Sequence, residues 1–175
     1  MNPLPPFPLL PALAALTFGT MLVETLRASA NERAQRALGG IEPAGDVYRI
    51  MRVVYPGAFL AMFTEGALRA APPFLVVLIG AALFIVAKGL KWWAILSLGP
   101  FWTFRVIVVP GAQLVASGPY RWLRHPNYVG VMGELAGVAL MTGALVSGVV
   151  GIVTFGVLVI RRMAVEDRAL REAAR

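Results

Sequence analysis

Two short polar runs in the second half of the chain hold the residue types that could do chemistry. The first, SGPYRWLRHPNYVG at residues 117–130, contains the only histidine, His125, with two tyrosines, two arginines and two prolines. The second, RRMAVEDRAL at residues 161–170, places Arg162 and Glu166 one helical turn apart, on one face of a helix. Histidine can exchange a proton near neutral pH, and arginine can orient an oxygen anion. Together they indicate a binding or catalytic site, although Arg162 and Glu166 alone would also fit an ordinary helix surface.

The composition predicts that lipid surrounds this site. Hydrophobic residues make up 58% of the 175 residues and the mean hydropathy is +0.74, above the roughly half-apolar composition of soluble domains. Several apolar runs approach the ~20 residues that a spanning helix needs. We therefore expect an all-α, polytopic integral membrane protein with about five transmembrane helices. The chain has no cysteine, and its net charge of +7 is spread between the apolar runs, which argues against a nucleic-acid partner.

The elements that must position the two polar runs follow from the apolar pattern. Residues 1–89 are expected to form an N-terminal set of three spans, at Leu9 to Leu26, Val53 to Leu68 and Phe74 to Ala87, with a surface helix at about 28–50. Residues 90–175 are expected to form a C-terminal region that starts with an interfacial segment from Leu90 to Val109, followed by the loop motif. A helical hairpin comes next, from Val129 to Ile160, with its break near Ser147-Gly148. A charged helix from Arg161 to Arg175 closes the region.

Basic residues predict the orientation. Residues 27–52, 88–128 and 161–175 each hold five Lys or Arg, whereas the opposite side has only Arg69. Because basic loops stay in the cytoplasm, the N-terminus is expected outside, the C-terminus inside, and both polar runs on the cytoplasmic side. The C-terminal half would then form a cofactor pocket on that side.

The two runs and their separation also resemble a known family. The run Gly118-Pro119-Tyr120, the run RHPNYVG at 124–130, the apolar hairpin, and Arg162 with Glu166-Asp167 resemble the isoprenylcysteine carboxyl methyltransferase family of membrane enzymes. The resemblance covers roughly Leu90 to Leu170, and residues 92–110 look especially like bacterial members, some of which methylate hydroxyls of long-chain polyketide lipids. Asp167 stands where the family usually has glutamate.

This resemblance implies a function and a set of site residues. It implies an O-methyltransferase that uses S-adenosylmethionine, needs no metal, and acts on a lipophilic acceptor arriving from the membrane. The acceptor would be an isoprenylcysteine-type carboxylate or the hydroxyl of an alkyl phenol or pyrone lipid. Arg162 would face the acceptor, and His125 is the candidate base if a hydroxyl must lose its proton. The residues implied to bind the donor are Gln113, Leu114, Val115, Tyr120, His125, Pro126, Asn127, Tyr128 and Glu166.

Two other functions fit parts of the sequence. Some sterol-type reductases that use NADPH carry a similar His-Pro and Tyr loop, although the helix with Arg162 and Glu166 argues against that class. A non-catalytic membrane subunit would tolerate substitution of Glu166 and His125. A carboxylate inside lipid is often functional, so Glu134, two turns inside the span after His125, could contact the acceptor.

Overall fold

The computed structural model describes residues 9–173, with side chains to residue 172, and it confirms that the fold is all-α. The long helices are α1 (Leu10–Ala37), α2 (Tyr48–Ala67), α3 (Phe74–Leu98), α4 (Pro126–Thr142) and α5 (Leu145–Ala173). Two short 3-10 helices, η1 (Gly99–Phe101) and η2 (Gly118–Arg121), lie between α3 and α4.

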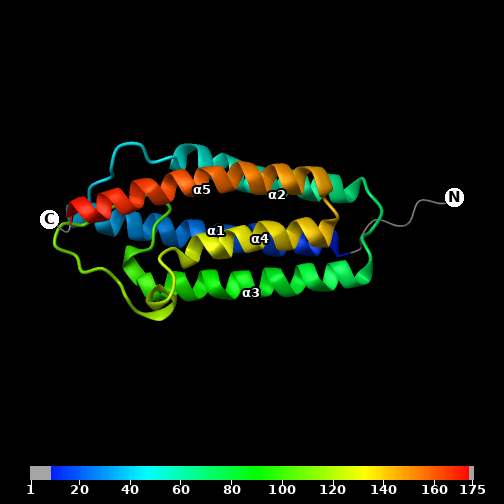
Figure 1. Ribbon diagram of the computed structural model, residues 1–175, viewed down its shortest axis with the longest axis horizontal. Helices are drawn as coiled ribbons and strands as arrows, with labels where there is room; N and C mark the ends of the chain where they lie inside the picture. Colours follow the sequence, from blue (N-terminus) through cyan, green and yellow to red (C-terminus); the bar gives the residue numbers. More distant parts are fainter. Residues whose placement is uncertain (1–8, 174–175) are drawn as a thin grey trace.

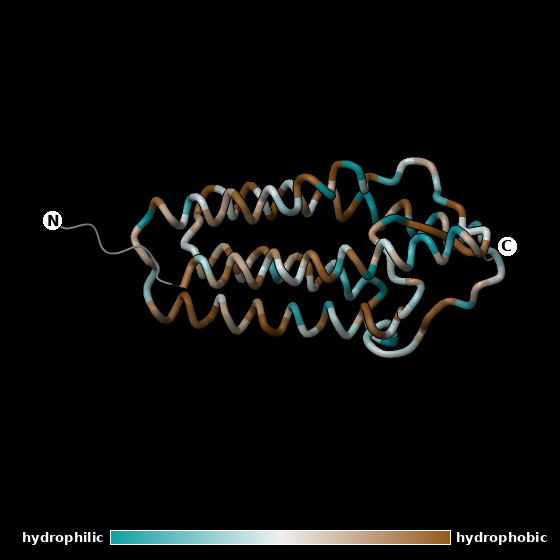
Figure 2. The backbone as a smooth tube through the Cα atoms, turned by 180° about the vertical axis from the view of Figure 1, so that it is seen from behind, coloured by the Kyte–Doolittle hydropathy of each residue, from teal (hydrophilic) through white to brown (hydrophobic). Residues whose placement is uncertain are grey.

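The five long helices lie side by side along the long axis of the molecule (Figure 1). The segments 38–47 and 99–125 and the last turns of α5 gather at one end, which we call the loop end. Hydrophilic segments concentrate there, whereas hydrophobic residues dominate the helices (Figure 2). The polar runs that the sequence singles out are therefore at the same end of an apolar bundle.

Two helical segments, Phe74–Phe101 and Leu145–Glu172, are long and apolar enough to cross a membrane. Only 22% and 33% of their most apolar windows are buried in the protein, so most of this apolar surface faces outward. Exposed apolar surface on this scale favours lipid as the surrounding medium. Five spans remain a prediction, since α4 has 17 residues and is about 25 Å long.

The N-terminal region differs from the expected span followed by a surface helix at 28–50. Helix α1 continues without a break to Ala37, and residues 38–47 contain no helix. The helix continues because no glycine or proline interrupts residues 20–38, and it ends just before Gly39, whose φ is +80°. The polar residues of 31–36 therefore belong to the end of α1.

Helix α3 also differs from the expectation that Lys88 and Lys91 close a span and an interfacial segment begins at Leu90. It runs through both lysines to Leu98, so the expected boundary at residue 89 lies inside a helix. Gly99-Pro100 ends it, since the proline cannot continue the hydrogen-bond pattern. The lysines can sit inside the bundle because each finds carboxylate partners there.

These partners form a closed ring of charges, which we call the ionic ring. Lys91 Nζ lies 2.6 Å from Glu24 Oε2 and 3.3 Å from Glu134 Oε2. Lys88 Nζ lies 3.2 Å from Glu24 Oε1 and 2.9 Å from Glu134 Oε1, and the Tyr55 hydroxyl donates to Glu134 Oε2 at 2.6 Å. The ring has no net charge and joins α1, α2, α3 and α4. Glu134, which the sequence suggests as a possible acceptor contact, is fully buried in this ring.

The hairpin of α4 and α5 confirms the expected pair of helices, but its break is at Gly143 instead of Ser147-Gly148. Gly143 has a φ of +66°, a left-handed conformation that ends α4. Gly148 lies inside α5, where a Cβ atom would come within 2.7 Å of the Ala139 Cβ, so its lack of a side chain allows the two helices to approach. The charged helix expected from Arg161 is the continuation of α5.

A carboxylate from α2 holds the start of α5. Glu65 accepts hydrogen bonds from the backbone N–H of Val146 at 3.2 Å and of Ser147 at 2.7 Å, and from the Ser147 hydroxyl at 2.6 Å. The first N–H groups of a helix have no partner within it, so Glu65 acts as a cap supplied by another helix. The Arg69 side chain binds the same carboxylate at 2.9 Å.

Candidate functional site

A cavity of about 670 Å³ opens at the loop end, between the segment 98–116, η2, the start of α4 and the last turns of α5. Its volume lies within the range usual for small-molecule sites. Of the residues implied by the resemblance, those that line it are Gln113, Leu114, Val115, Tyr120, His125, Asn127, Tyr128, Arg162 and Glu166. Pro126 does not line it, because it is the buried first residue of α4. The donor and acceptor roles of these residues remain predictions.

Tyr128 connects the expected donor and acceptor sides of the cavity. Its hydroxyl accepts a hydrogen bond from Arg162 Nε at 2.7 Å and donates one to Glu166 Oε2 at 2.8 Å. Arg162 and Glu166 share a face of α5, and Tyr128 reaches that face from the first turn of α4. A hydroxyl between a cation and an anion satisfies both, so the three side chains form one fixed unit.

Asp46, which lies in the segment before α2, holds Arg162. Its Oδ1 accepts from the Tyr48 backbone N–H at 3.0 Å and from Arg162 Nη1 at 3.0 Å. Its Oδ2 accepts from the backbone N–H of Val106, on the cavity wall, at 2.9 Å. Asp46 therefore neutralises the buried Arg162 and ties it to the wall. No local pattern marks a contact between residues so far apart in sequence.

His125 lies between the two carboxylates of α5. Its Nε2 is 3.1 Å from Asp167 Oδ1, and its Nδ1 is 3.8 Å from Glu166 Oε2. If the neutral ring carries its proton on Nε2 and donates a hydrogen bond to Asp167, Nδ1 keeps the lone pair that a base needs. Asp167 was not singled out as a site residue from the sequence. Within residues 9–172, no group of three acidic or histidine side chains is placed to hold a metal.

Tyr120 is half-buried in η2 and lines the same cavity. Burial, and then the negative charge of Glu166, raise the pKa of the Tyr120 phenol far above its ordinary value of 10.0. The phenol therefore stays protonated over the whole physiological range. Tyr120 can offer an aromatic face and a hydrogen-bond donor to a ligand, but it cannot act as a base.

The polar end of α1 fixes the wall opposite α5, which the sequence did not indicate. The Asn31 amide donates to the carbonyl oxygens of Gly99 at 2.9 Å and Trp102 at 2.8 Å. The Gln35 amide donates to the carbonyl oxygen of Pro100 at 2.8 Å. Trp102 is buried, and its indole N–H donates to Asn127 Oδ1 at 3.3 Å. Asn127 is thus positioned through a wall that α1 holds in place.

A second set of ion pairs fastens the two long segments of the loop end. Glu42 accepts from Arg36 at 2.7 Å and from Arg105 at 2.7 Å, and Glu32 is 3.0 Å from each of the same two arginines. Partial burial raises the pKa of Glu42, but hydrogen bonds from Arg36 and Arg105 outweigh this, so the net pKa is lowered from 4.5. We call these four residues the loop clamp, because they hold residues 38–47 and 99–116 together.

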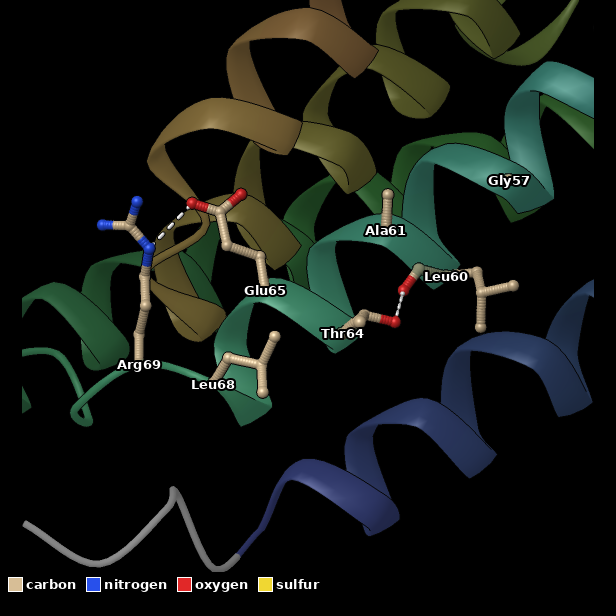
Figure 3. A pocket seen from close by; sticks show the side chains of 7 residues that line it. All are labelled: Gly57, Leu60, Ala61, Thr64, Glu65, Leu68 and Arg69. Atoms are coloured by element: carbon tan, nitrogen blue, oxygen red, sulfur yellow. Dashed lines mark hydrogen bonds and ion pairs between the residues drawn. The ribbon is translucent and has the colours of Figure 1, made fainter. Parts of the chain in front are cut away.

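A separate groove of about 710 Å³ lies far from this cavity, along the last turns of α2 beside α1 (Figure 3). Apart from Thr64, Glu65 and Arg69, its lining is apolar or glycine. Glu65 is already bound to Arg69 and to the start of α5, and the Thr64 hydroxyl bonds within its own helix. The groove therefore offers no group free for chemistry, and the cavity at the loop end is the candidate site.

A comparison with models of protein families shows which family this chain is related to. The profile named "Isoprenylcysteine carboxyl methyltransferase (ICMT) family" matches residues 78–172, which include every residue that lines the cavity. The chain belongs to this family. Membership implies a membrane methyltransferase, and methyltransferases of this family use S-adenosylmethionine.

Two bacterial proteins are similar to this family member. "Uncharacterized protein YpbQ" of Bacillus subtilis (strain 168) is 32% identical over 160 residues, which cover 91% of this chain and 95% of that protein. An "Uncharacterized protein" of Haemophilus influenzae (strain ATCC 51907 / DSM 11121 / KW20 / Rd) is 29% identical over 93 residues, covering 53% of this chain and 54% of that protein. No solved structure matches the chain.

Proposed function

We propose that the protein transfers the methyl group of S-adenosylmethionine to an oxygen atom of a lipophilic acceptor that reaches the cavity from the membrane. The observation that carries this proposal is the unit of Arg162, Tyr128 and Glu166, which joins the expected acceptor contact to the expected donor contact in one cavity. The family supports the reaction class.

The side chains of the cavity fit the proposed donor. Glu166 uses Oε2 for Tyr128, and no residue in the described part of the chain hydrogen-bonds to its Oε1, which is free to accept from a ribose hydroxyl. Tyr120 offers a neutral aromatic face, which attracts a cation such as a sulfonium. When bound, S-adenosylmethionine supplies an electrophilic methyl group, so that an O–C bond forms while the S–C bond breaks and its electron pair stays on sulfur. The protein contributes alignment, which can supply up to ~7 to 11 kcal/mol.

Arg162 is suited to orient the acceptor oxygen. Its Nε and Nη1 are used by Tyr128 and Asp46, and its Nη2 makes no hydrogen bond to any residue that the structure describes. The Asp46 carboxylate already balances the guanidinium charge, so a second carboxylate would meet no net positive charge at this point. Of the two acceptor classes, this favours a hydroxyl, such as that of an alkyl phenol or pyrone lipid. A hydroxyl must lose its proton, and His125 Nδ1 is the proposed base.

Binding of radiolabelled S-adenosylmethionine to the purified protein tests the proposal. We expect saturable binding that Glu166→Ala and His125→Ala abolish and that Glu172→Ala leaves unchanged. Glu172 is a matched control, because it is an exposed glutamate further along the same helix. Binding of NADPH instead would support a reductase. If the folded protein binds neither ligand, and Glu166→Ala and His125→Ala leave its biological role intact, a non-catalytic subunit would be supported.

We further propose five spans, with the loop end in the cytoplasm, the N-terminus outside and the C-terminus inside. The basic residues of the loop end support this orientation. Because the chain has no cysteine, a single cysteine placed at Ala112 or at Ala70 gives a unique label. In intact cells an impermeant maleimide should label the cysteine at 70 and spare the one at 112. The reverse pattern would overturn the orientation.

A further inference from the structure

Exposed aromatic and basic side chains gather at the edge of the candidate cavity, where η2 lies against α3. Trp122 is 68% exposed, Trp93 is 46% exposed, and Leu96 is 61% exposed. Figure 1 shows that the segment between α3 and α4 folds around the end of α3. We call this surface the Trp122 patch, and it consists of Trp93, Leu96, Arg121, Trp122, Leu123 and Arg124.

The patch is held rigidly in its exposed position. The backbone N–H groups of Trp122 and Leu123 both donate to Pro119 O, at 3.1 and 3.0 Å. The rings of Trp93 and Trp122 have centroids 5.8 Å apart. Gly118 has a φ of +60° and lies so close to α3 that a Cβ atom would overlap the Ser97 side chain. The chain therefore fixes these apolar side chains outward instead of burying them.

The charges of the patch lack protein partners. Neither Arg121 nor Arg124 makes an ion pair with any side chain in residues 9–172. The Arg121 guanidinium instead lies 5.8 Å from the centre of the Trp122 ring. Two free cations beside an exposed indole would complement a partner that is anionic at its surface and apolar just below it.

The position of the patch identifies that partner as lipid. Helix α3 belongs to one of the two segments long and apolar enough to span a membrane, and Trp93 lies about 7.5 Å before its end at Leu98. Tryptophan gathers at the level of lipid headgroups, and arginine next to the bilayer attracts anionic headgroups. Arg124 belongs to the patch and also lines the candidate cavity, next to His125.

We propose that the Trp122 patch is a docking surface for anionic phospholipid headgroups, and that their binding holds the loop that carries His125 and so strengthens donor binding. The second half of this proposal rests on the proposed function. The first half does not, because it concerns lipid contact alone. The link between them is short, since only Leu123 and Arg124 separate Trp122 from His125.

The lipid contact is tested by tryptophan fluorescence in lipid nanodiscs, with brominated phosphatidylglycerol or brominated phosphatidylcholine as quencher. The Trp122→Phe variant isolates the signal of Trp122 from those of the other three tryptophans. We expect phosphatidylglycerol to quench Trp122 more strongly, and Arg121→Gln to weaken this preference roughly fivefold. Arg33→Gln is the control, because Arg33 is also exposed and unpaired among the described side chains. Equal quenching by both lipids, or a preference as strong in Arg121→Gln as in the wild type, would overturn the docking surface.

The coupling is tested by the dissociation constant of S-adenosylmethionine in the same nanodiscs. We expect tighter binding in phosphatidylglycerol than in phosphatidylcholine for the wild type and for Arg33→Gln, and a smaller difference for Arg121→Gln. Donor binding of equal strength in both lipids would overturn the coupling alone. No donor binding in either lipid, with the quenching preference intact, would overturn the proposed function and leave the docking surface standing.

Discussion

Asp46 Oδ1 lies 3.0 Å from Arg162 Nη1, so the segment before α2 pairs with the last helix across 116 positions of sequence. Because both side chains are buried, the carboxylate fixes where the guanidinium points. We expect Asp46→Asn to lower turnover of the acceptor at least ~10-fold, about 1.4 kcal/mol in the barrier, and to raise the acceptor KM. The affinity for S-adenosylmethionine should change little. An unchanged turnover would contradict the role of Asp46 in orienting Arg162.

Tyr128→Phe removes the hydroxyl between Arg162 and Glu166 while keeping the ring. Hydrogen bonds to charged groups contribute more than neutral ones, so donor affinity should fall roughly 10-fold. Tyr48→Phe is the matched control, because the Tyr48 hydroxyl makes no hydrogen bond in the described structure, and it should leave affinity unchanged. Isothermal titration with S-adenosylmethionine measures both. Equal losses in the two variants would indicate a general loss of folding.

Glu134→Gln leaves the ionic ring with two lysines and one glutamate. An uncompensated charge inside the bundle is costly, so the variant should lose about 3 to 5 kcal/mol of stability. Adding Lys91→Met restores neutrality and leaves Lys88 paired with Glu24, so the double variant should recover more than half of that loss. Thermal unfolding in detergent measures this. A double variant less stable than Glu134→Gln would show that charge balance is not what the ring supplies.

Glu65→Ala removes the cap from the start of α5 at the end of the bundle opposite the site. Loss of a helix cap destabilises a protein, so the Tm should fall. Donor affinity should stay as in the wild type, because no residue of the cavity contacts Glu65. Thr64→Ala is the control, since the Thr64 hydroxyl only bonds within its own helix, to Leu60 O. A loss of donor affinity with Glu65→Ala would contradict this separation of cap and site.

The loop clamp should make stability depend on pH. The folded-state pKa of Glu42 is lowered from 4.5, so its stabilising contribution is present above pH 4.5 and is lost as the pH falls through the folded pKa. The Tm should therefore drop in this acidic range, and Glu42→Gln should lessen the drop while lowering the Tm at pH 7. The pH dependence of the Tm for both proteins checks this. An identical fall of the Tm at acidic pH in Glu42→Gln would show that other carboxylates cause it.

Local patterns in the sequence predicted much of the fold and the main members of the site. Apolar runs predicted the helices, and the family resemblance implied the site residues. The structure brings Tyr128, Arg162 and Glu166 to one cavity, where their roles stay predictions. The helices could be predicted because helix periodicity is a property of neighbouring residues. The ends of α1 and α3 were missed because Asn31, Gln35, Lys88 and Lys91 look like surface residues by type alone.

What only the tertiary structure decided is which distant groups neutralise one another. Glu24 and Lys91 are 67 residues apart, and Asp46 and Arg162 are 116 apart, so no local spacing records either contact. A buried charge is tolerated only where an opposite charge meets it, and packing of the helices determines that meeting. The sequence alone therefore determined which residues carry the candidate chemistry. The packed bundle decided how Arg162 is held and charge-balanced, because hydrogen bonds and ion pairs depend on distances that exist only after folding.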